Sequence, residues 1–463
     1  MKVQKRSFSP YYANDNSALI PEQWAAESLL ILEEEMVMGG LVHRDFEHIV
    51  ANYGETVHTR KPNEFIARRK TDADEVQDQA ASATNVPVVL NQWVHVAFII
   101  KDGERSKAFK DLVQFYLHPA MLANARILDR SLAGQSVQFL SNVRGGLGML
   151  TKDTAHEYYV GTRDMFNQNK VFMQGRNLVL GSSSEAKMLE TDLFIHADKV
   201  GDGGRALREA ELGRKFGFQN YMDINIPQNS SGTKSSPTTL DGAIDAGATT
   251  MTLAADNVAV GQYFTVVGDM TPLRCQTRDA NTAEIITATT RPTLRSALHE
   301  AVVQPYATGT VSASRANGYV KEIRVGGTGV PHVGQLVAFT NQTGPAIYTP
   351  EYTIVHVDSL GGGAYDILLD RPLENALAEN DIVNYGPDGE YNFAFHRNAV
   401  ALVNRPLALP MSNLATAAVA EYNNMSVRVT ITYDGKAQGH RVVVDGLFGV
   451  AVLDNALGGV LLG

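Results

Sequence analysis

The sequence is poor in cysteine, with Cys275 alone among 463 residues. A single thiol cannot form a disulfide within its own chain, and a structural zinc site built on cysteines is impossible. Charged residues make up only 19% of the chain, below the roughly one quarter that is usual in soluble proteins. The composition excludes a disordered, collagenous or coiled-coil chain. The fold must therefore be held by packing alone.

Positive charge is also scarce, because 40 Lys and Arg face 50 Asp and Glu for a net charge of −10. A dedicated nucleic-acid reader would carry a basic face, so that class is not expected. Long apolar runs are missing too: Val86–Ile100 is interrupted by Asn91, Gln92 and His95 and is too short to cross a bilayer. The polar stretch Tyr11–Ser17 does not fit a cleaved signal peptide. We expect a globular chain of roughly two to four domains in a reducing, aqueous compartment, with no membrane contact.

The first half of the chain carries helical periodicity. Pro21 suits a first helical position, and apolar residues recur at helical spacing until Gly39-Gly40 ends the run. A second, longer apolar stripe predicts a helix over Lys107–Leu140. Because proline lacks a backbone donor and clashes with the preceding turn, Pro119 predicts a kink in this helix.

An extended excursion, Tyr53–Ile100, separates these two helices. A basic cluster, Arg68 to Lys70, is followed by acidic residues and then by alternating apolar positions. This pattern predicts two strands joined by a long polar tip. Two shorter helices are expected farther along the chain, over Glu185–Phe194 and Arg205–Lys215.

The composition changes near Gln228, where a polar, turn-rich linker runs to Pro237. Beyond the linker, Val, Thr and Ile dominate, as in strands. Residues 229–385 hold nine Lys and Arg against fifteen Asp and Glu, a net charge of −6. This part therefore has a surface of its own, as an inserted domain would.

An internal repeat lies within the same part. Val260-Gly-Gln262 matches Val333-Gly-Gln335 at an offset of 73, and Arg291-Pro292 matches Arg371-Pro372 at an offset of 80. A seven-residue insertion in the second copy explains the difference between the two offsets. The repeat leaves two arrangements open: one barrel built from two similar halves, or two small barrels.

No motif of catalysis stands out. Gly201–Ala206 fits the loosest dinucleotide pattern, but the segment before it is too polar for a buried strand, so a plain turn is the better interpretation. Asp72, Asp74 and Asp78 lack the turn glycine of a calcium loop, which favours a solvated acidic tip. The twelve histidines show no zinc-binding spacing. We expect no enzyme activity, no cofactor and no metal site.

The C-terminal part carries the most distinctive pattern. Phe395-His-Arg-Asn-Ala399, an Arg405-Pro-Leu407 turn and a closing Gly449-Val-Ala-Val-Leu453 follow one another in that order. This order resembles the C-terminal signature of the P22-type coat proteins, which are major capsid proteins of tailed bacteriophages with the HK97-like fold. The resemblance covers roughly the last seventy residues directly, and the layout of the rest agrees with it.

The resemblance implies an α+β, HK97-like capsid fold with an inserted all-β, barrel-like domain. The chain would supply an N-terminal arm, an E-loop, a spine helix with the peripheral domain, the first part of an axial domain, the inserted β domain with its tandem repeat, and the axial and peripheral return strands. These parts would correspond to residues 1–50, 51–105, 106–144, 145–228, 229–385 and 386–463, respectively.

The implied function is that of a major capsid protein, a structural virion protein that self-assembles into the icosahedral shell enclosing phage double-stranded DNA. Its partners would be copies of itself in hexamers and pentamers, a scaffolding protein, a portal, and DNA enclosed without specific binding. Its location would be the virion, after assembly in the cytoplasm of a bacterial host. Contacts between subunits are expected from the arm and from the E-loop tip, at Trp24, Arg68, Arg69, Lys70, Asp72, Asp74, Glu75 and Asp78.

Two other interpretations stay open. Another virion structural protein with tandem β domains, such as a tail or surface component, would not need the long helix and the E-loop together. An intracellular enzyme would rest on the Gly201 turn alone. The acidic balance suits a container for DNA, since a basic inner wall would condense the DNA against it.

Overall fold

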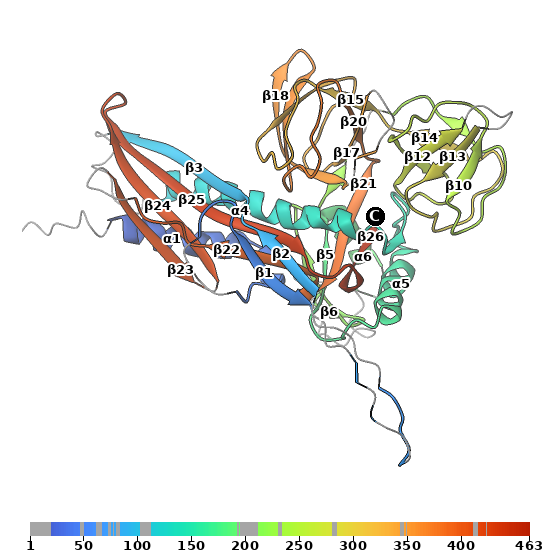
Figure 1. Ribbon diagram of the computed structural model, residues 1–463, viewed down its shortest axis with the longest axis horizontal. Helices are drawn as coiled ribbons and strands as arrows, with labels where there is room; N and C mark the ends of the chain where they lie inside the picture. Colours follow the sequence, from blue (N-terminus) through green and yellow to red (C-terminus); the bar gives the residue numbers. More distant parts are fainter. Residues whose placement is uncertain are drawn as a thin grey trace, which may run out of the picture.

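The structure is a computed structural model that describes residues 20–46, 51–61, 67–72, 76, 78–79, 84–101, 113–191, 194, 212–229, 234–279, 285–342, 347–348, 350–410, 415–422 and 424–463. Figure 1 shows an elongated sheet with two long helices on one side and a central sheet beside it. Two small β units lie side by side above the central sheet, and a two-stranded ribbon forms a sheet of its own.

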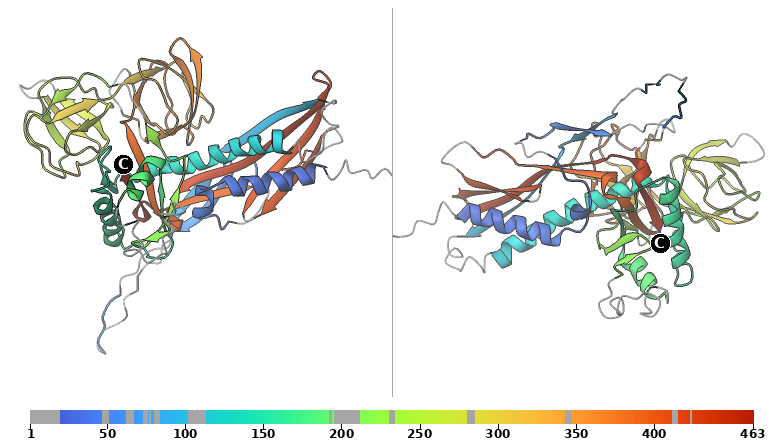
Figure 2. Two further views of the ribbon diagram at one scale, coloured as in Figure 1. Left: turned by 180° about the vertical axis from the view of Figure 1, so that it is seen from behind. Right: turned by 90° about the horizontal axis from the view of Figure 1, so that it is seen from below.

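The elongated part, which we call the peripheral sheet, is a five-stranded antiparallel sheet. Its longest strand, β25 (Gly439–Val452), pairs with β22 (Val400–Arg405), β3 (Gln92–Lys101) and β24 (Met425–Asp434), which in turn pairs with β23 (Thr416–Tyr422). Helices α1 (Ile20–Glu35) and α4 (His118–Gly134) cover one face (Figure 2). Alternate valines of β24 and β25 are buried on this face, namely Val427, Val429, Val442 and Val444.

The helix predicted over Lys107–Leu140 is present from Val113, where the described part of this segment begins. It starts with a π-helical turn, η1 (Val113–Leu117), continues as α4 and ends with a 3-10 turn, η2 (Gln135–Phe139). Pro119 lies in the first turn of α4, directly after η1. A change of helix type there accommodates the missing N–H and the ring of proline.

The N-terminal helix ends earlier than predicted. α1 stops at Glu35, and Gly39 and Gly40 lie inside a separate short helix, α2 (Met38–Leu41), instead of terminating the first one. The buried carboxylate of Asp129 on α4 accepts hydrogen bonds from the N–H groups of Val37 (2.8 Å) and Gly39 (3.2 Å). A side chain from another helix therefore satisfies backbone donors that the break leaves free.

The central sheet is built around the strand that carries the Phe-His-Arg motif, β21 (Gly389–His396). It lies between β26 (Gly458–Leu462) and β5 (Arg176–Leu180). The sheet continues through β4 (Val143–Gly145) on one side, through β7 (Phe218–Met222) and β6 (Arg214–Lys215) on the other, and β8 (Gln228–Asn229) pairs with the start of β21. Every residue of β5 and β26 is buried, as expected for strands covered on both faces.

Helices near this sheet differ from the sequence-based predictions. α6 runs over Ser182–Leu189, so it starts before the predicted Glu185, because the Glu390 carboxylate accepts hydrogen bonds from the N–H groups of Ser183 (3.0 Å) and Ser184 (2.7 Å). The predicted helix over Arg205–Lys215 is wrong at its end, where Arg214 and Lys215 form β6. Residues 205–211 lie outside the described ranges.

Another helix beside the central sheet was also not predicted. α5 (Ala155–Gln168) packs against β26 and β4, and it buries Ala155, Tyr159, Thr162 and Phe166. These positions follow helical spacing, so the periodicity of the sequence could have identified the helix.

Residues 238–385 form two consecutive six-stranded units. The first barrel contains β9 (Thr238–Thr239), β10 (Thr250–Leu253), β11 (Tyr263–Val266), β12 (Leu273–Asp279), β13 (Ile285–Thr289) and β14 (Val302–Pro305). The second barrel contains β15 (Thr308–Val311), β16 (Ile323–Gly327), β17 (Leu336–Thr340), β18 (Tyr352–Gly361), β19 (Ala364–Leu369) and β20 (Ile382–Tyr385).

The two units share one strand order, β10-β13-β12-β11-β14-β9 in the first and β16-β19-β18-β17-β20-β15 in the second. β15 pairs with β16 and closes the second barrel, and a bridge between Leu240 and Leu253 joins the corresponding ends of the first. Of the two arrangements that the repeat left open, the structure has two separate six-stranded units rather than one barrel built from two halves, and the second unit is a closed barrel. Most of the insertion lies between β17 and β18, since the starts of β11 and β17 differ by 73 positions and those of β12 and β18 by 79.

Candidate assembly surfaces

The two-stranded ribbon is a sheet of its own that packs on β25 through β2. β1 (Thr56–Lys61) pairs antiparallel with β2 (Thr84–Val89), from Thr56 opposite Val89 to Lys61 opposite Thr84. At its base, Val88 and Leu90 are fully buried against a cluster that includes Val403 and Leu447. An isolated ribbon of two strands is at best marginally stable in water. The packing at the base stabilises only the part of the ribbon nearest to it.

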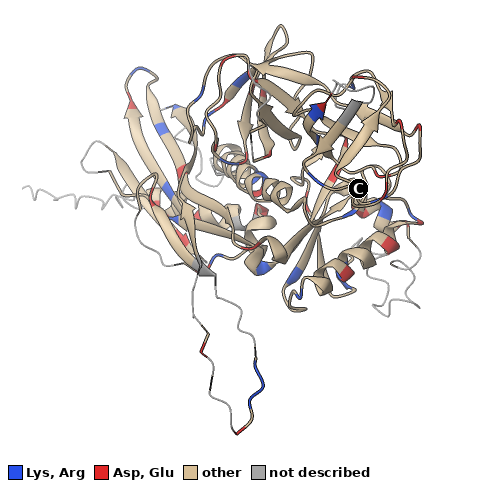
Figure 3. Ribbon diagram, turned by 45° about the vertical axis from the view of Figure 1, so that its right-hand side comes forward, with Lys and Arg blue, Asp and Glu red and all other residues tan. Residues whose placement is uncertain are grey.

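The charged residues predicted to make contacts lie at the far end of this ribbon. Arg68, Arg69, Lys70, Asp72 and Asp78 are all exposed. Figure 3 shows the basic segment and the acidic residue that follows it well away from the body of the molecule. Asp74 and Glu75 lie outside the described residues. The contact of these charges with another subunit stays a prediction.

Trp24 differs from the other predicted contact residues. Its side chain is only 3% exposed and belongs to the core between α1 and the peripheral sheet. Its ring lies 6.1 Å from that of Phe98 on β3, measured between centroids. Trp24 is therefore a core residue of its own chain in this conformation, and a neighbouring subunit cannot reach it.

An exposed tryptophan lies instead on the open face of the peripheral sheet, where sequence reasoning did not place a contact. Trp93 on β3 is 48% exposed, and its indole N–H donates to Asp445 Oδ2 (3.0 Å). Arg428 pairs with the same carboxylate, and its guanidinium carbon lies 5.8 Å from the Trp93 ring centroid. The strict alternation of β3 places Trp93 and Ile99 on the face opposite Phe98, a signal that the sequence already contained.

Beside Trp93 is a cleft of about 790 Å³ between the edge of the peripheral sheet, α4 and the second barrel. Its lining is mostly apolar and includes Ile127, Leu368 and Pro372, with Lys321 and Glu322 also lining it. An apolar cleft beside a fixed, half-exposed tryptophan has the composition of a protein-binding surface.

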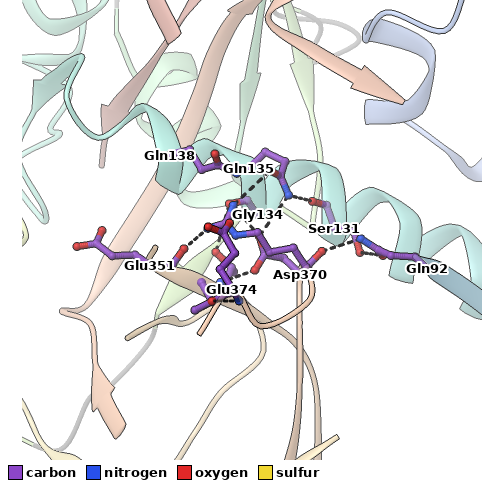
Figure 4. A network of polar contacts seen from close by, with 11 residues as sticks. Gln92, Ser131, Gly134, Gln135, Gln138, Glu351, Asp370 and Glu374 are labelled. Atoms are coloured by element: carbon purple, nitrogen blue, oxygen red, sulfur yellow. Dashed lines mark hydrogen bonds and ion pairs between the residues drawn. The ribbon is translucent and has the colours of Figure 1, made fainter. Parts of the chain in front are cut away.

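A polar network joins the C-terminal end of α4 to the second barrel (Figure 4). Asp370 Oδ2 accepts a hydrogen bond from the Gln135 side chain (3.3 Å), and Oδ1 accepts one from the N–H of Thr353 (2.9 Å). Arg371 Nη1 donates to Gln135 Oε1 (3.3 Å), and Gln92 donates to the main-chain oxygen of Asp370 (3.0 Å). Burial raises the pKa of Asp370, although the neighbouring Arg371 opposes this effect. The network fixes the barrel on the helix.

A second buried carboxylate, Asp129, lies in the C-terminal half of α4 and faces α2. Burial raises the pKa of Asp129 to about 8, and the negative charge of Asp223 adds to the effect. The hydrogen bonds from the backbone N–H groups of Val37 and Gly39 oppose it. This side chain therefore titrates near neutral pH while it holds the start of α2.

In the described ranges, no group of three or more His, Cys, Asp and Glu residues is arranged to hold a metal ion. None of the helices that the structure describes is long and apolar enough to span a bilayer.

Comparisons with known proteins returned solved structures alone. No family model and no curated protein matches the sequence. A structure of Mycobacterium phage Che8 aligns at 12% identity and a TM-score of 0.41, covering 92% of this chain and 90% of that chain. The capsid of cyanophage P-SCSP1u aligns at 10% identity and a TM-score of 0.43, covering 92% and 87%. The mature capsid of bacteriophage PhiM1 aligns at 6% identity and a TM-score of 0.40, covering 100% and 91%. All three TM-scores lie below 0.5.

Proposed function

We propose that this chain is a major capsid protein of the P22-type, HK97-like class, which assembles with copies of itself into a closed shell around phage double-stranded DNA. The observation that carries the proposal is the ribbon of β1 and β2. Its base is anchored in the chain, while the described residues of its tip are exposed and charged. Because two strands alone are marginal in water, such a ribbon needs a surface on another molecule.

Shells arise when one surface of a subunit binds a different surface of the next, and the contact repeats by symmetry. The ribbon is one such surface. The open face of the peripheral sheet, with Trp93 and the adjoining cleft, is a chemically different one. Opposite charges at the ribbon tip, Arg68 to Lys70 and Asp72, would set the register of the contact more than its affinity.

The charge of the chain agrees with a container for DNA. With a net charge of −10, the subunit has no excess of positive charge to neutralise phosphates. Packaged DNA would therefore be enclosed without being tightly bound by the shell. The proposal includes no catalysis, and the resemblance of the C-terminal motifs extends it to hexamers and pentamers, a scaffolding protein and a portal.

Expression of the full chain, followed by size-exclusion chromatography and electron microscopy, tests the proposal. Megadalton shells or shell fragments are expected. A discrete monomer or small oligomer under all assembly conditions would contradict it and would favour a tail or surface component with tandem β domains.

Variants of the ribbon sharpen this test. The triple variant R68E/R69E/K70E should lower the yield of shells while the monomer stays folded, because these side chains are exposed. The variant Lys152→Glu reverses an exposed charge far from the ribbon and serves as the control. Equal shell yields from the two variants would remove the ribbon from the assembly contact.

A further inference from the structure

The two barrels dock through the same face, each on a different neighbour. The repeat offsets make three positions of this face equivalent: Gly261, Arg274 and Arg291 in the first barrel, and Gly334, Thr353 and Arg371 in the second. Gly261 and Gly334 have φ angles of 84° and 83°, which glycine adopts without strain. The repeat therefore preserves a docking face as well as a strand order.

The second barrel uses this face to dock on the end of the spine helix, which we define as Val113–Phe139. The Thr353 hydroxyl donates to the carbonyl of Gly134 (3.5 Å), and Arg371 Nη1 donates to Gln135 Oε1 (3.3 Å). Gly334 lies so close to β8, on the segment that leads into the first barrel, that a Cβ there would be 2.8 Å from the backbone nitrogen of Gln228. This is the first of three interfaces (Figure 4).

The first barrel uses the equivalent face to dock on the second barrel. Arg274 is 1% exposed and donates to the carbonyls of Tyr348 (3.0 Å) and Phe339 (2.8 Å). Arg291 pairs with the Glu351 carboxylate at 2.5 Å, and both side chains are largely buried. Arg371, the counterpart of Arg291, donates to the main-chain oxygen of Glu351. Glu351 therefore receives the equivalent arginine of each barrel.

The first barrel also reaches the start of the axial part, at residues 145–149. The N–H of Leu147 donates to the carbonyl of Met270 (2.8 Å). Arg295 Nη1 donates to the carbonyl of Gly145 (3.1 Å), and the guanidinium carbon lies 5.2 Å from the ring centroid of Tyr158 on α5. This third interface closes a ring of contacts that runs from the spine helix through both barrels to the axial part.

We propose that the double barrel is a brace that fixes the angle between the spine helix and the axial part. The chain passes directly from Gly134 to Gly145 through η2 and β4, and the two barrels span the same two points from outside. A rotation of the helix against the axial part must therefore break one of the three interfaces. In a shell, which rests on the proposed function, the brace would hold this angle constant from subunit to subunit and so narrow the range of shell sizes.

The brace is tested by opening one interface at a time in the full chain. Arg291→Glu places two carboxylates together at the barrel-to-barrel interface, and Arg295→Met removes the side-chain donor at the axial interface. Hydrogen exchange measured by mass spectrometry should be at least about tenfold faster over residues 134–147 in both variants, because local opening no longer has to break a closed ring. Strands inside each barrel should keep their protection.

Arg324→Glu is the matched control, since it breaks an exposed ion pair with Asp366 inside the second barrel and leaves all three interfaces intact. Exchange over residues 134–147 that is unchanged from the control in either folded variant would overturn the brace. If Arg291→Glu prevents folding, Arg295→Met decides the question alone. This readout uses isolated chains, so it is independent of shell formation. If wild-type shells form, variants with faster exchange should give a broader distribution of diameters, and an unchanged distribution would refute the effect on shell size.

Discussion

Replacing Gly134 by alanine sets two physical effects against each other at the spine helix. Gly134 is the last residue of α4 and is buried. Alanine is favoured over glycine in a helix by about 1 kcal/mol, because it loses less backbone entropy on folding. A methyl group at this position would, however, lie 2.7 Å from Cβ of Asp370 and 3.2 Å from its Oδ2. Helix propensity predicts a stabilised protein, whereas packing predicts a destabilised one.

Packing should dominate, because Asp370 has little freedom to move. Its buried carboxylate accepts hydrogen bonds from Gln135 and from the N–H of Thr353. Overpacking a close contact costs about 1–3 kcal/mol, and loss of a hydrogen bond to a buried charged group costs about 1–3 kcal/mol more. After the gain of about 1 kcal/mol in helix propensity is subtracted, we expect Gly134→Ala to lower the free energy of unfolding by about 1–5 kcal/mol.

Scanning calorimetry of the unassembled chain measures this effect. The transition that includes the spine helix should fall by at least about 2 °C. Gly40→Ala is the matched control, because Gly40 also lies in a helix but nothing lies within 4 Å of its added methyl group. The control should be neutral or stabilised. A Gly134→Ala variant that gains stability as the control does would refute the close packing of helix and barrel.

Three further predictions follow from the buried and the exposed groups. The pKa of Asp129 is raised from the ordinary 3.8 to about 8, so folding favours the protonated form of this side chain. The stability that protonated Asp129 contributes is complete below about pH 4 and is lost by about pH 8. The difference in melting temperature between Asp129→Asn and the wild type should therefore shift in favour of the variant as pH rises through this window, and a pH-independent difference would contradict the assignment. Burial raises the pKa of the Cys275 thiol to about 11, so a thiol reagent at pH 8 should label it only after unfolding; rapid labelling of the native chain would show that the first barrel opens. Shell assembly through the ribbon tip should weaken between about 0.1 and 1 M salt, and this salt dependence should shrink in the R68E/R69E/K70E variant, as light scattering can measure.

The hydrophobic pattern of the sequence predicted the helices and strands that neighbouring residues determine. The alternation around Val86 and Val88 predicted strands, and the long stripe before Leu140 predicted the spine helix. The ends of helices were predicted less well. Asp129 caps the break after α1, and Glu390 caps the start of α6, and both side chains come from distant parts of the chain. Such caps cannot be read from the residues next to the helix.

The two tryptophans also show that distant residues decide which side chains are exposed on the candidate surfaces. Sequence reasoning assigned Trp24 to a contact with a neighbour, but packing against Phe98 buries it. Trp93 was not singled out, yet Asp445 and Arg428 hold it half exposed on the open face of the sheet. Both residues sit in amphipathic elements. Which side of an element meets the core depends on what covers it, and the covering helices lie far away in sequence.

The sequence by itself determined that no disulfide forms within the chain, that the surface is acidic, and that a β unit occurs twice between residues 229 and 385. These properties depend on composition and on similarity along the chain, which need no folding to be read. Only the tertiary structure decided that the repeat makes two barrels and that both dock through one face. Docking depends on three contacts: Arg291 with Glu351, Arg371 with Gln135, and Arg295 with Gly145. Contacts between residues so far apart arise from the packing of the whole chain, so no local pattern specifies them.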